Sequence, residues 1–246
     1  MPDSEPPSMA PLGELAEQSL LRRDPQYLTA LRALDAVAWA NPSLTLAEKH
    51  LICLAAAAAV TDLDAQRIRL HITRALEAGA TEPQVVEVIE LTSALGVHAC
   101  TEGLPALLDA IEPLDASPMS PRQRQLQATF VDKRGYWNAV WDGLLRLDED
   151  YFEAYLNFSA HPWATDHLSP AMKELVYVAF DATASHLYRP GIEIHVRNAL
   201  KLGATPQQVA NVFTLLSTLG ARTTSIAIQI LDDIHSTRSG PEATDV

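Results

Sequence analysis

The sequence contains few cysteines and few basic residues. Its two cysteines, Cys53 and Cys100, are too few for a disulfide scaffold or a four-cysteine metal site, and their separation excludes a CxxC redox pair. The 18 Lys and Arg residues face 31 Asp and Glu residues, which gives a net charge of −13. Because a nucleic-acid-binding protein presents a basic face, we expect no nucleic-acid partner.

Long apolar runs and common catalytic loops are also missing. The longest apolar run, at 51–60, is mostly alanine and is far shorter than the roughly 18 residues of a membrane span. There is neither a Gly-rich phosphate loop nor a GxSxG nucleophile motif. The acidic start, MPDSE, is unlike a secretory signal. With 48% hydrophobic residues, we expect a soluble, cytoplasmic globular protein without a membrane partner.

The sequence does contain an internal repeat. LTLAEKHLICLAAAAAV at 44–60 aligns with LSPAMKELVYVAFDATA at 168–184, a shift of 124 residues, and 68–96 align with 192–220 at the same shift. From 20 to 98, 30 of the 79 positions are identical to their counterparts. Chance would give only a handful, so the chain is a tandem duplication. We predict a first repeat at 14–112 and a second at 122–235, with one fold and a pseudo-two-fold relation.

The periodicity of both repeats is helical. Leu175, Val178 and Ala182 recur at spacings of three and four and form one apolar face. The link LGATPQQ combines a glycine suited to the end of one helix with Thr205 and Gln208, which form a capping box for the next. Alternating β-branched residues and hairpin turns are absent. The sequence therefore predicts an all-α protein with about six helices per repeat.

The two repeats differ most in their aromatic residues. Of fifteen aromatic residues, only Tyr27 and Trp39 lie in the first 124 positions. Within one predicted helix, Tyr177, Phe180 and Asp181 stand where the first repeat has cysteine or alanine. One interpretation is a pocket in the second repeat, with rigid walls and a few polar groups. The other is bulkier packing alone.

Several ionisable residues of the second repeat are placed for acid–base chemistry. Glu174 and Asp181 are seven residues apart on one predicted helix and so share a face. His186 and Tyr188 lie in the following turn, and His195 lies on the apolar stripe of the next helix. Burial can raise the pKa of a Glu near an imidazole toward neutrality, which suits proton transfer. A histidine that only forms hydrogen bonds in the core is the alternative.

Metal binding is not expected from the spacing of these residues. Glu174, His186 and His195 are separated by 12 and 9 residues, unlike the i, i+3 or i, i+4 pairs of helical metal sites. We therefore predict a site without a metal.

The second repeat contains an ordered pattern: KELVYVAFDA, a short turn, then HVRNALKLGATPQQVANVF and a Leu-Gly. This pattern resembles the carboxymuconolactone decarboxylase family, which includes alkyl hydroperoxidase D. The resemblance covers 44–110 and 168–235. It implies an all-α fold built as a duplicated alkyl hydroperoxidase D-like unit. It also implies a homo-oligomer, namely a trimer with pseudo-hexameric symmetry.

The peroxidase branch of that family carries a Glu, a CxxC motif and a His. Glu174 and His195 match its ends, but Tyr188 and Gly191 stand at the cysteine positions. Without a thiolate there is no peroxidatic nucleophile, so thiol peroxidase activity is disfavoured. In the first repeat His50 replaces the Glu and aspartates replace the two turn residues, so we expect a scaffold half there.

The resemblance implies a cofactor-independent lyase or isomerase that acts on a small carboxylated or lactone substrate. His195 would be the acid–base residue, oriented by Glu174, while Tyr188 and His186 would stabilise an enolate oxygen or donate a proton. An arginine would hold the substrate carboxylate, and Arg222 is notable because the first repeat has His98 there. A non-catalytic binding or assembly protein is the alternative. The expected substrate-binding residues are Trp163, Tyr177, Phe180, Asp181, Arg189, Arg197 and Arg222.

Overall fold

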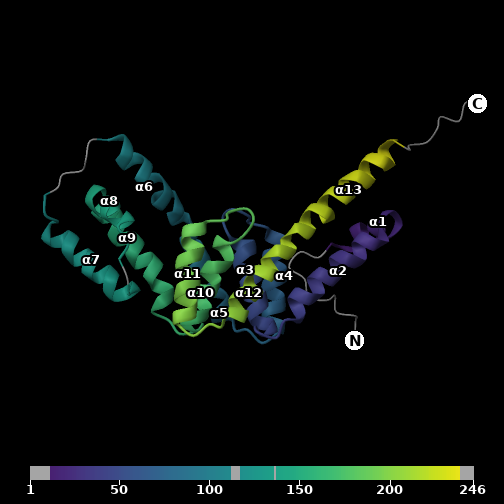
Figure 1. The fold of residues 1–246 in the computed structure, drawn as a ribbon, viewed down its shortest axis with the longest axis horizontal. Helices are drawn as coiled ribbons and strands as arrows, with labels where there is room; N and C mark the ends of the chain where they lie inside the picture. The colour runs from purple at the N-terminus through teal and green to yellow at the C-terminus, as the bar shows by residue number, and fades with distance from the viewer. Residues whose placement is uncertain (1–11, 112–116, 136, 239–246) are drawn as a thin grey trace, which may run out of the picture.

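The structure of the protein, a computed structural model, describes residues 12–111, 117–135 and 137–238. Within these ranges all regular structure is helical, so the predicted all-α class is confirmed (Figure 1). The first repeat consists of α1 (Glu14–Arg23), α2 (Pro25–Ala40), α3 (Leu46–Ala58), α4 (Ala65–Glu77), α5 (Glu82–Ser93), the 3₁₀ turn η1 (Ala94–Val97) and α6 (His98–Ala110). The second consists of α7 (Pro121–Arg134), α8 (Val140–Leu147), α9 (Glu149–Ala160), η2 (His161–Trp163), α10 (Pro170–Asp181), α11 (Arg189–Lys201), α12 (Pro206–Ser217), η3 (Thr218–Gly220) and α13 (Ala221–Arg238).

The helix boundaries repeat with the shift found in the sequence. The bounds of α4 and α5 coincide, after a shift of 124 residues, with those of α11 and α12. The predicted capping box is present at Thr205–Gln208, and its counterpart at Thr81–Gln84 has the same two bonds. The duplication is therefore confirmed at the level of local structure. Helix α7 has no counterpart among the described residues of the first repeat.

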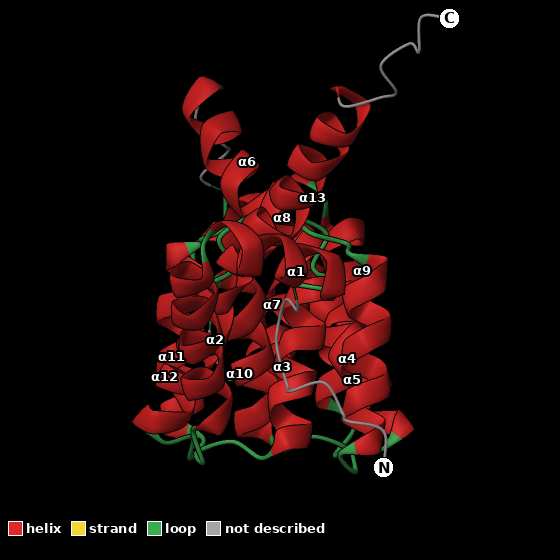
Figure 2. Cartoon of the chain, turned by 90° about the vertical axis from the view of Figure 1, so that its right-hand side faces the viewer, coloured by secondary structure: helices red, strands yellow, loops and turns green. Residues whose placement is uncertain are grey.

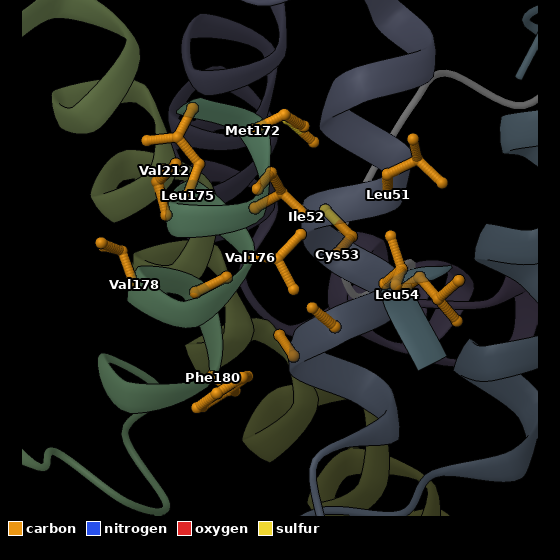
Figure 3. Close-up of a cluster of buried hydrophobic side chains, with 14 of the residues drawn as sticks. Leu51, Ile52, Cys53, Leu54, Met172, Leu175, Val176, Val178, Phe180 and Val212 are labelled. Atoms are coloured by element: carbon orange, nitrogen blue, oxygen red, sulfur yellow. The ribbon is translucent and has the colours of Figure 1, made fainter. Parts of the chain in front are cut away.

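The main core lies between the two repeats. Helices α3 and α10 pack against each other at the centre of the molecule, and their side chains interlock in Figure 3. Helix α10 is buried along nearly its whole length, from Met172 to Asp181. Alanines on α3, from Ala55 to Ala57, let the larger side chains of α10 approach closely. The central bundle is completed by α4, α5, α11 and α12.

The last helix of each repeat packs against the other repeat. Helix α6 packs on α8 and contributes Leu104 to the apolar cluster of α7–α9. Helix α13 packs on α1 and contributes Ala221 to a separate apolar cluster with α1 and α2. Figure 1 shows these two groups on opposite sides of the central bundle, and Figure 2 shows α6 and α13 projecting beyond it. The predicted units 14–112 and 122–235 are therefore interleaved, and their autonomy as domains stays a prediction; position 112 lies outside the described residues.

The interleaving places the start of α6 beside the turn of the second repeat that follows α10. It likewise places the start of α13 beside the turn of the first repeat that follows α3. No helix within the described ranges is both long and apolar enough to cross a membrane.

Candidate active site

A buried carboxylate–imidazole pair joins α10 to α11. His195 Nδ1 lies 2.6 Å from Glu174 Oε2, and the Glu174 side chain is 6% exposed. Asn198 donates from Nδ2 to the other Glu174 oxygen at 3.2 Å. With Nδ1 donating to the carboxylate, His195 Nε2 is the nitrogen left to accept or deliver a proton. The sequence predicted these two residues as partners, and the structure brings them together.

Asp181 lies at the end of α10 and is completely buried. Neither of its carboxylate oxygens has a hydrogen-bond partner within the described part of the chain. Burial, together with the charge of Glu174, raises the pKa of Asp181 to about 8. Its Oδ2 lies 4.0 Å from Nε2 of His195. Because a buried unpaired carboxylate is costly, it points to a functional demand rather than to packing.

Gly191 makes room for this carboxylate. A Cβ atom at Gly191 would lie 2.0 Å from Asp181 Oδ2 and 2.7 Å from the ring of Tyr188, so a larger residue does not fit. Sequence reasoning noted Gly191 only as an absent cysteine. The structure shows that the missing side chain is what allows α11 to pass Asp181.

The turn between α10 and α11 folds His186 and Tyr188 back toward Asp181. Leu187 adopts a left-handed conformation (φ 49°), and the Tyr188 amide donates to the Asp181 carbonyl at 2.8 Å. In the first repeat the residue at the position of Tyr188 is Asp64, whose side chain caps α4; Tyr188 provides no such cap for α11. The aromatic residue therefore replaces a stabilising cap.

His98, from the start of α6, completes this cluster from the other repeat. Its Nδ1 lies 2.8 Å from His186 Nε2, and its ring contacts that of Tyr188 at a tilt of 36°, with centroids 3.9 Å apart. Burial, reinforced by the nearby His186 and His195, lowers the pKa of His98 to about 4. Sequence reasoning noted His98 only as the counterpart of Arg222. No local pattern could place it here, because the contact depends on the interleaving of the repeats.

A cavity of about 140 Å³ opens beside this cluster. This volume is comparable to one aromatic ring, which fits a small substrate. Of the predicted residues, Tyr177, Phe180, Tyr188 and His195 line it, while His186 contacts His98 instead. Trp163 lies behind the wall and donates from Nε1 to the Tyr177 hydroxyl at 3.0 Å. Further walls come from Leu95, Val97, His98, Arg134, Trp141 and Tyr155.

The structure does not bring the three predicted arginines to the cavity. The side chains of Arg189 and Arg197 are 86% and 73% exposed, and both pair with Glu193. Arg222 instead reaches the first repeat, where it pairs with Asp62 at 2.5 Å.

Arg134, at the end of α7, is the arginine that lines the cavity. Its guanidinium carbon lies 5.3 Å from the Trp163 ring centre and 6.0 Å from that of Tyr177. It also donates to the Ser159 carbonyl at 3.2 Å. Sequence reasoning did not select it, since α7 is outside the duplicated pattern.

Neither cysteine is among the residues that line the cavity. Cys53 is completely buried on α3, and burial raises the pKa of its thiol far above its usual range. Cys100 lies 3.9 Å from the Tyr151 hydroxyl. Both thiols are free, so there is no bridge between them. Because a thiolate is the reactive form, Cys53 is unsuited as a nucleophile.

One group of side chains has the donor set of a metal site. His98, Asp181 and His186 each offer one ligand atom, and these atoms lie within 4.8 Å of one another. The sequence-based prediction of no metal considered Glu174, His186 and His195, whereas the structure groups different residues.

An all-α tandem repeat, with a buried Glu–His pair beside a small aromatic cavity, defines the class of this protein. Similarity to known proteins gives its family. The chain belongs to the carboxymuconolactone decarboxylase family, whose model matches residues 25–116 and 149–227. It is also similar to a crystal structure from Burkholderia xenovorans LB400, provisionally named a gamma-carboxymuconolactone decarboxylase subunit. The identity is 40%, the TM-score is 0.86, and 93% of each chain is covered. No curated protein matches the chain.

Proposed function

We propose that this protein is a carboxymuconolactone decarboxylase-like lyase or isomerase that transfers a proton on a small carboxylated or lactone substrate. The family supports a decarboxylase-like reaction class. The observation that carries the proposal is the 2.6 Å contact between His195 Nδ1 and Glu174 Oε2, at the wall of a cavity sized for one ring. This contact fixes the imidazole so that Nε2 can act as the acid–base atom.

The cavity also offers groups for the negative charge that such a reaction develops. When His195 removes a proton from carbon, charge moves to a carbonyl or lactone oxygen of the substrate. Tyr188 and Arg134 line the same cavity, and a hydroxyl and a guanidinium can donate to that oxygen or to a carboxylate. A substrate that holds this charge itself needs no organic cofactor.

A rate comparison tests the assignment. We expect purified wild type to convert at least one member of a panel of carboxylated enol-lactones, and Glu174→Gln to lower kcat/KM by roughly 10²–10⁴-fold. Glu193→Gln, an exposed change on the same hairpin, is the matched control. Equal rates for wild type and Glu174→Gln would contradict the proposal. Thermal stabilisation by organic acids without turnover of any lactone would favour the binding-protein alternative.

We also propose that the protein works as a homo-oligomer, a trimer with pseudo-hexameric symmetry. The similar structure is named a subunit, and α13 carries exposed apolar side chains at Ile226, Ile230 and Ile234. Light scattering after gel filtration would measure the mass. A monomer at micromolar concentration would contradict this proposal.

A further inference from the structure

Asp181 is a buried carboxylate without a cation among the described residues that face it. It is completely buried, neither oxygen is hydrogen-bonded, and the side chains around its oxygens are the imidazoles of His98, His186 and His195. A charged carboxylate in such a place requires a positive partner or a proton.

The first repeat shows how a carboxylate in this region of the unit is neutralised when cations are present. There Asp62, on the corresponding turn, pairs with Arg67 at 2.6 Å and with Arg222 at 2.5 Å. Arg67 occupies the position of Gly191, and Arg222 that of His98. In the second repeat a glycine and an imidazole stand in place of these two guanidinium groups, and His186 stands in place of Asp62. The carboxylate comes instead from Asp181, where the first repeat has Ala57.

We propose that His98, Asp181 and His186 bind a divalent transition-metal ion such as zinc. One ligand atom from each lies within 4.8 Å of the others, and two nitrogens with one carboxylate oxygen suit this class of ion. The proposal is independent of the lactone chemistry above.

The distances in the cluster suit closure around an ion. Bonds of about 2.0–2.2 Å in a tetrahedral site put neighbouring ligand atoms roughly 3.3 Å apart. His98 Nδ1 and His186 Nε2 are now 2.8 Å apart, and His186 Nε2 lies 4.0 Å from Asp181 Oδ1, so the values bracket that spacing. Small ring rotations would exchange the histidine–histidine hydrogen bond for two metal–nitrogen bonds and give Asp181 its missing partner.

The surroundings fit a site with open coordination. Only three protein ligands are offered, so a remaining position falls to water or to a substrate oxygen. His98 lines the cavity, and the second oxygen of Asp181 faces His195 Nε2 at 4.0 Å. The ion would therefore lie between the cavity and the proposed acid–base residue.

Metal titration of the full chain, prepared without a histidine tag and stripped by a chelator, tests this proposal. We expect about one Co²⁺ per chain, with visible absorption typical of a low-coordinate site, and displacement of Co²⁺ by Zn²⁺. His98→Ala and Asp181→Asn should each weaken binding by roughly 100-fold or more, because even outer-shell partners contribute about 10–100-fold. His186→Gln, at a less buried residue, provides a third variant should either of the others fail to fold.

Two controls separate this inference from the proposed function. His161→Gln removes an exposed histidine elsewhere and should bind Co²⁺ as wild type does. Glu174→Gln should also keep the ion, even though it is expected to lose turnover. Absence of stoichiometric Co²⁺ or Zn²⁺ binding by wild type would overturn the metal site, as would equal binding by folded His98→Ala. A metal-binding protein that converts no lactone would instead overturn only the proposed function.

Discussion

The corresponding turns of the two repeats have similar backbones, but the side chains gathered at them differ in charge and in pairing. In the first repeat, the turn after α3 is closed by ion pairs, with Arg67 buried and Arg222 bound to both Asp62 and Asp64. In the second, the turn after α10 surrounds an unpaired Asp181 with imidazoles and borders a cavity. A few exchanged residues on one scaffold therefore separate a structural ion-pair cluster from a candidate active site.

The largest expected difference between the repeats is in catalysis. His195→Gln should lower kcat/KM by roughly 10²–10⁴-fold, since it removes the proposed acid–base nitrogen. His71→Gln changes the corresponding histidine, which is bonded to His50 rather than to a carboxylate, and should leave the activity per folded molecule unchanged. Steady-state kinetics on both variants would check this. A similar loss of activity in both variants would mean that the histidines of the two repeats contribute equally to catalysis.

The second difference is a buried ion pair at the junction of the repeats. Lys173 Nζ lies 3.1 Å from Glu87, and both side chains are almost fully buried. Glu87→Ala should cost about 3–5 kcal/mol in unfolding free energy, because it leaves the buried charge of Lys173 without its carboxylate partner. The counterpart of Glu87 is Asn211, which donates to the Ala38 carbonyl at 3.0 Å. Asn211→Ala should cost only about 1–3 kcal/mol. Urea denaturation of both variants would measure the two losses.

The third difference is a pH effect that arises at His50 of the first repeat, whose counterpart in the second repeat is Glu174. Burial, together with Arg74 and Lys49 and against Glu77, lowers the pKa of His50 from 6.5 to about 4. The unfolded chain therefore binds this proton more readily, so stability falls as the pH drops from 6.5 toward 4. The loss reaches about 3 kcal/mol.

His50→Gln should remove this part of the pH dependence. Unfolding free energies of wild type and variant, measured from pH 7 to pH 4, should diverge as the pH falls. Parallel curves would contradict the assignment.

The smallest expected difference concerns the space at Gly191. Gly191→Ala places a methyl group 2.0 Å from Asp181 Oδ2 and should cost about 1–3 kcal/mol, with displacement of the carboxylate. Gly103→Ala, on α6, meets no atom within 4 Å and should be neutral or stabilise by up to about 1 kcal/mol. Thermal unfolding of both variants would show whether the space beside Asp181 requires a glycine at position 191.

Local patterns predicted the helices, because helical periodicity depends on spacing along the chain. The pairing of Glu174 with His195 was expected from the resemblance to the family, and the two residues lie on neighbouring helices of one hairpin. The same spacing argues against Arg197 as a cavity residue. It is two positions from His195, so its side chain points about 200° round the helix, toward solvent. His98 and Arg134 could not be predicted this way. Their placement depends on which helix packs across which repeat, and this is decided by tertiary packing rather than by periodicity.

The exchange of last helices between the repeats also explains how the asymmetry became possible. Two separate copies of a single-repeat chain, paired in the same way, would carry one residue at both equivalent positions, and every substitution would alter both sites at once. With the repeats joined, position 98 can be histidine while position 222 is arginine. Covalent linkage thus frees each half to specialise, so that one turn can be closed by charge for strength while the other stays open for chemistry.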